Sequence, residues 1–421
     1  MECGTTLNSS VNTGIQRVVR SIVRESDYLS EEFGYRCIKV AFNGSKICLV
    51  SEPKIETKSL LKLATNVFIR LLVNIKNIKK AYTLIPNIAK EFSSRHIRRL
   101  VGYVNNSSQE IPININSEAD SLEILLLLDS TWDNRIWPGV DEFRARGGHV
   151  CAVLYDLIPF SHPKTVEEVT RIAHTQWWVE APLHLDSIMC ISSAVRDDYL
   201  DWQKKLNISR KLSPESVGYF HLGANLKRDD PVIEVFNSRR PSFLVVGSIE
   251  PRKNHAFILD AFDQLWNNDE EINLVIVGGF GWKCGEVLSR IQTHPEFGRR
   301  LFLIKDASDR DLNRLYEISE AIIIASLAEG FGLPIVEALY HGTAVICSDI
   351  PVFREIAGMN ASYFDLACNS ELAMLVSKYA KDKKNLATPD RAKYGQWISW
   401  SESTRQLFER MFSLAAKNQE I

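Results

Sequence analysis

The sequence has no long apolar run and almost no net charge, and each absence excludes a class of protein. No uncharged stretch reaches the ~18–20 residues that a membrane-spanning helix needs, and no cleavable signal heads the chain. The formal net charge is −2, so no overall positive field attracts nucleic acid. We therefore expect a cytoplasmic protein that does not bind nucleic acid.

The sequence also lacks the spacings of common metal and cofactor sites. Its eight cysteines form no Cys-x-x-Cys pair, and several lie in apolar runs such as "HVCAVLY", which is typical of buried free thiols in a reducing compartment. His162, His174 and His184 are ten or more residues apart, farther than paired zinc ligands. The loop "GGFGW" lacks the Lys-Ser/Thr of a P-loop. We predict no metal site and no cofactor.

Apolar runs alternate with helical patterns along most of the chain, which is typical of parallel α/β sheets. In the C-terminal half the predicted strands are "SFLVVG", "NLVIVGG", "LFLIK", "AIIIAS" and "TAVICSD". The N-terminal half shows the same rhythm less clearly, in "RCIKVAF", "LEILLLLD", "HVCAVLYD", "SIMCIS" and "ESVGYFH". With 421 residues the chain exceeds a single core of about 250–300 residues. We predict two Rossmann-like domains.

The predicted bounds are an N-terminal domain over 1–225, a linker over 226–241, a second domain over 242–395 and a terminal helix over 396–421. The linker is polar, contains two prolines and has no clear periodicity. The terminal helix is amphipathic, and we expect it to begin at a serine cap near Ser401 and to pack back on the N-terminal domain.

Residues 53–104 interrupt this alternation with a basic helical insertion. They carry eleven Lys/Arg against two Glu, interleaved with apolar runs such as "LLKLATNVFIRLLV". A basic amphipathic helix pair can lie on an anionic bilayer, here the inner face of the plasma membrane. Polybasic faces are also common on soluble insertions whose charges are merely solvated. The sequence leaves both alternatives open.

The stretch "AEGFGLPIVEALYHG" (328–342) predicts a helix start suited to an anion. Pro334 has no backbone N–H and a φ suited to the first turn, so we expect the helix to begin near Leu333. Free N–H groups and the positive end of the helix dipole favour a phosphate there. Gly330 and Gly332 allow that phosphate to approach the backbone closely.

Glu329 precedes this predicted helix and Glu337 lies about one turn inside it, an arrangement unsuited to clamping one metal ion. Together with the strand that follows, "ASLAEGFGLPIVEALYHGTAVICSD" resembles the donor-site motif of the retaining GT-B glycosyltransferases of the large family-four group, which includes bacterial mannosyltransferases and sucrose synthases. The resemblance implies that Glu337 binds the ribose hydroxyls of a nucleotide sugar and that Glu329 contacts the transferred sugar. It also assigns the diphosphate to the intervening backbone, Gly330, Phe331, Gly332 and Leu333.

The stretch "VVGSIEPRKNH" (245–255) resembles the strand-loop element of the same family, whose basic residues neutralise the diphosphate leaving group. Arg252 and Lys253 fit this role, because the departing diphosphate gains negative charge in the transition state. Gly247 and Ser248 would lie on the donor side. Many members have arginine where this chain has Ser248, so Arg252 would supply the second cation. The alternative is a solvated helix start with two exposed bases.

The stretch "NTGIQRVVR" (12–20) resembles the first loop and helix of a branch that assembles bacterial polysaccharides. The resemblance implies that Gly14 meets the diphosphate. Arg17 would be an acceptor-side or phosphate contact, or else an ordinary surface arginine. Few residues precede this loop, so we expect the usual first strand to be short or missing, with the true start upstream or the chain cut from something longer.

The stretch "VLYDLIPFSHP" (153–163) resembles a cleft-lining loop of the same branch, at the sheet edge where α/β proteins bind ligands. Tyr155 would lie on the acceptor side, where many relatives have histidine. Asp156 would either bind an acceptor hydroxyl or cap the next turn. We interpret His221 as a packing residue.

Two further patterns have ordinary structural interpretations. Ser308 and Asp311 predict a helix capping box rather than a metal site. The tryptophans of the N-terminal half are expected in the core, although one could stack on an acceptor sugar; they are Trp132, Trp137, Trp177 and Trp178.

The resemblance as a whole implies a GT-B hexosyltransferase of cell-surface polysaccharide synthesis, of the O-antigen and lipopolysaccharide type. The donor would be a nucleotide sugar, with GDP-mannose or a related GDP-sugar favoured, and the acceptor a saccharide, expected to be lipid-linked. Transfer would retain the anomeric configuration without a divalent metal. One alternative is a relative that hydrolyses or epimerises sugar nucleotides. Another is an inactive scaffold in a polysaccharide-assembly complex.

Overall fold

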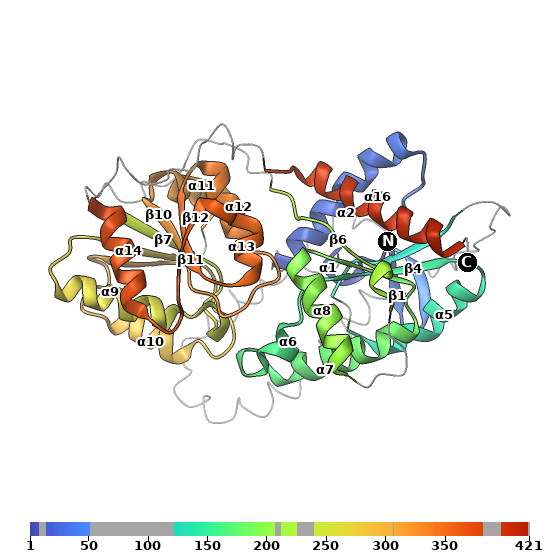
Figure 1. Cartoon of the computed structure of the whole chain (residues 1–421), viewed down its shortest axis with the longest axis horizontal. Coiled ribbons are helices and arrows are strands. Elements are labelled where there is room, and N and C mark those ends of the chain that lie inside the picture. The colour runs from blue at the N-terminus through green and yellow to red at the C-terminus, as the bar shows by residue number, and fades with distance from the viewer. Residues whose placement is uncertain are drawn as a thin grey trace, which may run out of the picture.

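The computed structural model describes residues 1–7, 14–50, 122–130, 132–206, 212–224, 240–305, 307–381 and 397–419. The basic insertion at 53–104 and residues 226–239 of the predicted linker lie outside these ranges. Figure 1 shows two α/β units side by side, each a sheet with helices packed against it. Among the helices of the described ranges, none is both long enough and apolar enough to cross a bilayer.

The N-terminal unit contains a parallel sheet in the order β3-β4-β5-β6. Its strands are Ile124–Leu127, His149–Leu154, Ser187–Cys190 and Val217–Tyr219. Nearly all of their residues are buried, as expected of a sheet covered on both faces. The helices of this unit are α1 (Gly4–Leu7), α2 (Gly14–Phe33), α5 (Trp137–Ala145), α6 (Ile158–Ser161), α7 (Glu168–Glu180) and α8 (Ser193–Lys205).

One predicted strand of this unit pairs differently from the rest. The run "RCIKVAF" contains β1 (Val40–Asn43), which forms an antiparallel hairpin with β2 (Lys46–Leu49). The hairpin closes through a two-residue turn that begins at Gly44, whose φ of 60° favours glycine. The place of a first parallel strand is taken by the segment around Glu2, which bridges both Val40 and Leu127.

The second unit is a six-stranded parallel sheet in the order β12-β11-β10-β7-β8-β9. The strands are β7 (Ser242–Val246), β8 (Asn273–Val277), β9 (Leu301–Ile304), β10 (Ala321–Ile324), β11 (Ala344–Ser348) and β12 (Ala361–Phe364). This is a doubly wound order, and the chain reverses its winding direction between β7 and β10. Ligands of such sheets bind beyond the carboxyl ends of the strands at this switch point.

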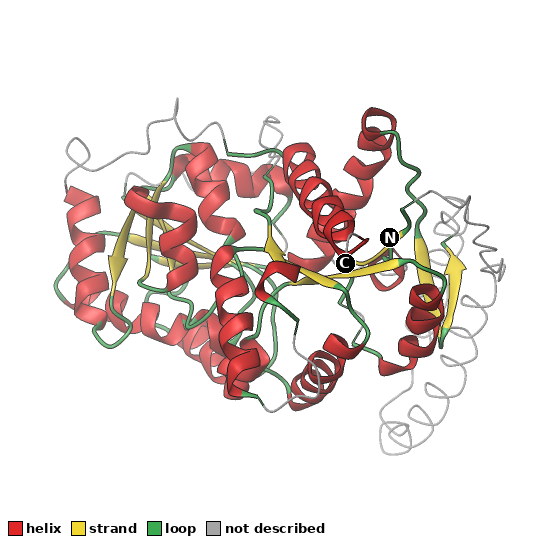
Figure 2. Cartoon of the chain, turned by 45° about the vertical axis from the view of Figure 1, so that its right-hand side comes forward, coloured by secondary structure: helices red, strands yellow, loops and turns green. Residues whose placement is uncertain are grey.

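Helices cover both faces of the second sheet (Figure 2). On one face are α9 (His255–Asn267), α10 (Gly285–Thr293) and α14 (Asn369–Lys381); on the other are α11 (Asp309–Ile318), α12 (Leu333–His341) and α13 (Pro351–Ala357). Neighbouring residues of β7 belong to different cores, since Phe243 and Val245 share a cluster with α9, whereas Leu244 belongs to the cluster that contains α11 and α12. Successive side chains of a strand point to opposite faces of the sheet, so this alternation determines which helix layer each residue at the end of a strand faces.

The terminal helix α16 (Trp400–Gln419) lies along α2 and next to β5 and β6, so it returns to the N-terminal unit (Figure 1). Phe408 and Met411 enter the N-terminal core, and Arg405 pairs with Glu32 of α2. The helix cap is Ser399, whose Oγ accepts from the Glu402 N–H at 3.1 Å. The prediction of a cap near Ser401 was two residues late, because Ser401 already lies in the first turn.

Candidate active site

The start of α12 has the backbone geometry that its sequence predicts. The helix begins at Leu333, and Gly332 before it has a φ of 98°, a left-handed conformation that suits glycine. A Cβ on Gly332 would also lie 2.9 Å from the Phe353 ring. Glycine is therefore required at this position, and the first N–H groups of α12 are held at the switch point of the sheet.

Glu329, on the loop before α12, is the centre of a buried charge cluster. Lys253 Nζ donates to its Oε1 at 2.5 Å, Arg252 Nη1 lies 2.6 Å from its Oε2, and Ser326 Oγ donates at 2.8 Å. Burial alone would raise the pKa of Glu329, but the Arg252 and Lys253 charges outweigh burial and lower that pKa to about 2. The carboxylate is thus ionised at neutral pH.

Arg252 and Lys253 follow β7 on a short 3₁₀ turn, Pro251–Lys253. Each side chain is only 16% exposed, so the alternative of a solvated helix start is wrong. Arg252 also pairs with Glu250 at 2.7 Å and donates to the Ala328 carbonyl at 3.0 Å. Burial raises the pKa of Glu250 although both cations oppose the rise.

The loop between β7 and these cations contains the predicted donor-side residues Gly247 and Ser248. Gly247 has a φ of 142°, and a Cβ there would lie 3.4 Å from Lys253 Cε. The Lys253 side chain therefore runs over the Gly247 backbone. Ser248 lies between this glycine and the cations.

Glu337 lies inside α12 with its side chain 3% exposed. Tyr316 Oη of α11 donates to its Oε2 at 2.7 Å, and Arg17 Nη1 donates to its Oε1 at 2.5 Å. Arg17 belongs to α2, so this ion pair joins the two units. Burial lowers the pKa of Arg17, but the Glu337 carboxylate outweighs burial and the pKa is raised. The Arg17 side chain thus lies on a predicted donor-side carboxylate, and its role as an acceptor-side or phosphate contact stays a prediction.

Tyr155 and Gly14 are two further predicted residues of the N-terminal unit. Tyr155 is buried, and its Oη donates to the Leu128 carbonyl at 2.6 Å. Its phenol is therefore bonded to the backbone of its own unit, and its acceptor-side role stays a prediction. Gly14 begins α2 as an exposed residue, and no atom of the described residues lies within 4 Å of a Cβ built on it.

The carbonyl of Tyr155 marks a close approach of the units. A Cβ on Gly330 would lie 2.1 Å from that oxygen. The next residue, Asp156, accepts from the Ile158 N–H at 3.0 Å and so caps the following turn, one of the two alternatives that the sequence allowed. Burial raises the pKa of Asp156, and the Arg252 charge in the other unit opposes the rise. Asp156 and Arg252 therefore attract each other electrostatically across the two units.

A small cavity of about 40 Å³ lies beside Asp156, with Asp129, Trp132 and His174 in its lining. His174 Nε2 contacts the Asp156 carbonyl at 3.2 Å, and its Nδ1 has no hydrogen-bond partner among the residues that the structure describes. Burial lowers the pKa of His174 to about 4. Sequence reasoning considered His174 only as a zinc ligand. Trp132 is partly buried and lines this cavity together with Trp177 and Trp178, which are buried in the core, as is Trp137.

A second set of contacts between the units was missed. Glu355 of α13 accepts from the Ser193 and Ala194 N–H groups at the start of α8, each at 2.8 Å. His221 Nε2 lies 2.7 Å from the same carboxylate. Burial would raise the pKa of Glu355, but His221 and the two N–H groups lower it to about 2. No local pattern could have found these partners, which lie more than 100 residues apart in sequence.

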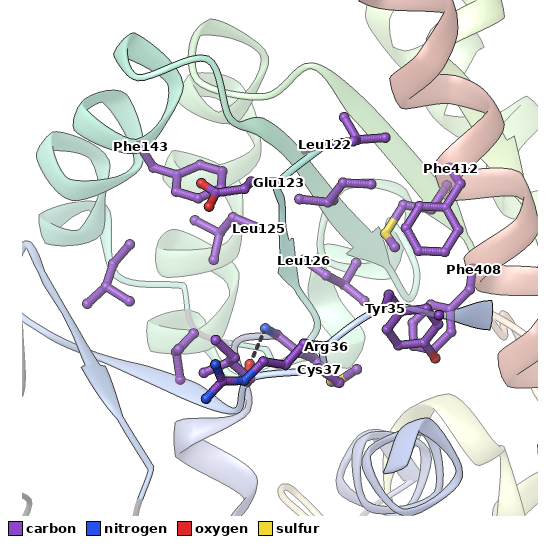
Figure 3. Close-up of a pocket in the computed structure, with 17 residues that line it drawn as sticks. Tyr35, Arg36, Cys37, Leu122, Glu123, Leu125, Leu126, Phe143, Phe408 and Phe412 are labelled. Carbon is purple, nitrogen blue, oxygen red and sulfur yellow. Dashed lines mark hydrogen bonds between the residues drawn. The ribbon is translucent and has the colours of Figure 1, made fainter. Parts of the chain in front are cut away.

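A larger cavity, of about 610 Å³, lies near the N-terminal end of β3 (Figure 3). Its labelled lining is mostly apolar and comes from β3, α5, α16 and the segment after α2, including Tyr35, Leu125, Phe143, Phe408 and Phe412. None of the site residues named above lines it. Within the described ranges, no group of three or more His, Cys, Asp or Glu side chains is arranged to hold a metal ion. Ser308 and Asp311 form the predicted capping box of α11.

Comparison with known proteins shows which sequences and structures the chain is similar to. Residues 227–396 match the family described as glycosyl transferases group 1. This match covers less than half of the chain. The chain is 34% identical to the serotype-specific mannosyltransferase WbdA of Escherichia coli, over 65% of this chain and 34% of that protein. It is 35% identical to the O-antigen chain mannosyltransferase RfbU of Salmonella typhimurium, over 29% of this chain and 33% of the relative. The chain thus spans about a third of the length of these curated relatives.

Solved structures share the fold of this chain. HepE of Anabaena, in complex with UDP and glucose, superposes with a TM-score of 0.55 at 17% identity, covering 69% of this chain and 78% of HepE. A glycosyltransferase from Rickettsia africae gives 0.56 at 14% identity and covers 94% of both chains. These comparisons confirm the predicted GT-B class with two Rossmann-like domains. They also confirm the family resemblance.

Proposed function

We propose that this chain is a hexosyltransferase that moves a sugar, with mannose favoured, from a nucleotide donor to a saccharide in O-antigen-type polysaccharide synthesis. The observation that carries the proposal is the switch point of the second sheet. There α12 begins just after Glu329, which pairs with the buried Arg252 and Lys253, and Glu337 inside α12 pairs with Arg17 of the other unit. This combination fits a diphosphate, its ribose and the transferred sugar.

In the proposed reaction the acceptor hydroxyl oxygen attacks the anomeric carbon from the face that the diphosphate leaves. The bond between that carbon and the phosphate oxygen breaks, and the leaving phosphate takes the hydroxyl proton. The N–H groups of α12, Arg252 and Lys253 stabilise the negative charge that develops on the phosphate. Glu329 orients the sugar and Glu337 the ribose, while Asp156 orients the acceptor hydroxyl. The anomeric configuration is retained, and neither an enzymic nucleophile nor a divalent metal is needed.

The names of the curated relatives support mannose as the transferred sugar. A GDP donor and a lipid-linked acceptor are part of the same proposal. The complex of HepE with UDP is the reason to test uridine nucleotides equally. Thermal unfolding with GDP, UDP, ADP and CMP in the presence of EDTA tests the site. A ligand at a hundred times its dissociation constant stabilises a protein by about 2.7 kcal/mol. No shift with any nucleotide would contradict the proposal and favour a scaffold.

Substitution of the predicted ribose ligand gives an independent test. We expect Glu337→Ala to weaken binding of the stabilising nucleoside diphosphate about tenfold or more, since the hydroxyls lose a charged acceptor. Isothermal titration calorimetry measures this, with Glu317→Ala on the exposed side of α11 as control. Equal affinities of the wild type and the Glu337 variant would remove the ribose role. Turnover of the sugar nucleotide without any acceptor would instead indicate a hydrolase or an epimerase.

A further inference from the structure

The cations of the candidate site are matched by carboxylates. Arg17 is paired with Glu337, Lys253 with Glu329, and Arg252 with both Glu329 and Glu250. The three cations and three carboxylates therefore carry no net charge between them. A nucleoside diphosphate brings additional negative charge, and a matched set of ion pairs offers it no surplus cation. Beyond the N–H groups of α12, a cation of this set can contact the ligand only if its ion pair opens.

Arg17 is the cation that is most easily released. Its side chain is 32% exposed, whereas those of Arg252 and Lys253 are each 16% exposed. It also comes from α2, in the unit opposite its carboxylate. Glu337 keeps a second donor, because Tyr316 Oη remains on its Oε2. When this ion pair opens, the buried carboxylate therefore keeps one hydrogen-bond donor.

Helix α2 is anchored, so Arg17 can move only through its side chain. Val18, Val19 and Ile22 of this helix are buried in the N-terminal core. Glu337 lies five residues after Gly332, which corresponds to about 7 Å along the axis of α12. The distance from the carboxylate to the anion-binding end of the helix is thus comparable to the length of an extended arginine side chain.

We propose that Arg17 is an exchange cation for the donor. Without donor it neutralises Glu337; when a nucleoside diphosphate binds, the guanidinium moves to the phosphates and the ribose hydroxyls take its place on Glu337. This inference rests on the proposed function and adds a residue that couples occupation of the ribose site to recognition of the diphosphate. It also explains why an arginine from one unit reaches a buried glutamate of the other.

The exchange predicts opposite responses to charged and uncharged ligands. In Arg17→Gln the diphosphate loses a charged contact, and its affinity should fall about ten- to hundredfold. An uncharged nucleoside has no phosphate to contact, and its ribose no longer competes with a guanidinium for Glu337. Its affinity should stay the same or rise. If Arg17 only supports the fold, its substitution should lower the affinity for both ligands to the same extent.

Calorimetric titration of the full chain with GDP and guanosine, and with UDP and uridine, tests this inference. Arg17→Gln should lower the ratio of diphosphate to nucleoside affinity at least tenfold, and Arg17→Lys, which keeps the charge, should change it far less. Arg24→Gln, an exposed position on the same helix, is the matched control. If Arg17→Gln does not fold, Arg17→Met repeats the test with an uncharged stem.

The outcomes separate the exchange from the proposed function. A wild type that binds diphosphate, combined with an unchanged affinity ratio in the uncharged variants, overturns the exchange alone. A proportional loss of both ligands also overturns it, since it assigns Arg17 a structural role. A wild type that binds no nucleoside diphosphate overturns the proposed function, and the exchange with it.

Discussion

At the scale of single residues, Glu329 is where burial and charge oppose each other most directly. Its pKa of about 2 lies below the value of 4.5 for an unperturbed glutamate. A depressed carboxylate pKa adds stability above the unfolded value, and this stability is lost as pH falls through the folded value. The contribution of Glu329 should therefore be complete above about pH 4.5 and disappear toward pH 2.

This linkage makes the stability of a Glu329→Gln variant depend on pH in a defined way. The variant should be less stable than the wild type at pH 7, because Arg252 and Lys253 lose their shared partner. The difference should shrink as pH falls from about 4.5 toward 2, where the wild-type carboxylate also becomes neutral. Urea unfolding at several pH values measures it. Glu142→Gln, on an exposed carboxylate of α5, is the control, and a difference independent of pH would contradict the prediction.

Lys253 has a role that turnover can test. If it stabilises the departing diphosphate, Lys253→Ala should lower kcat by ~10²–10³, the usual effect of losing one charge-stabilising donor. Assays of nucleoside diphosphate release measure this, with Lys378→Ala on the exposed side of α14 as the matched control. A Lys253 variant that turns over at the wild-type rate would leave this lysine as a structural partner of Glu329.

At the scale of elements, local chemistry explains which features were predictable. Pro334 and the surrounding glycines predicted the start of α12 within one residue, because a helix N-terminus is encoded by adjacent residues. Strand β12 was missed because it is a four-residue edge strand and mostly half-buried, without a strong apolar run. The Arg17–Glu337 pair joins residues 320 apart. No spacing in the sequence could reveal it.

Gly330 links the α12 loop to β4 in the other unit, and a single methyl group tests that link. In Gly330→Ala the new Cβ would lie 2.1 Å from the Tyr155 carbonyl, so the two units must separate locally. A shift of about 1 Å can cost 10²-fold in rate, and we expect kcat to fall by about that factor while each unit stays folded. Gly285→Ala, which meets open space at the start of α10, should behave like the wild type. Normal turnover of Gly330→Ala would show that the close approach is dispensable.

At the scale of the whole molecule, charge is divided unevenly along the chain. Residues 53–104 carry eleven Lys/Arg and two Glu, whereas the full chain has a net charge of −2, so the remainder is clearly negative. This segment lies outside the residues that the structure describes. Attraction to anionic lipid must then come chiefly from this segment. The resulting prediction concerns the location of the protein and is independent of the donor site.

We expect the full chain to bind vesicles containing anionic phospholipid at low salt, at about 1 kcal/mol per basic residue near the surface. Binding should weaken as salt is raised, since screening shortens the electrostatic range. Deleting residues 55–100 should abolish sedimentation with these vesicles, and replacing the eleven basic residues by Gln should do the same without shortening the chain. Neutral phosphatidylcholine vesicles are the control. A wild type that sediments with neither vesicle would show that the basic charges are simply solvated.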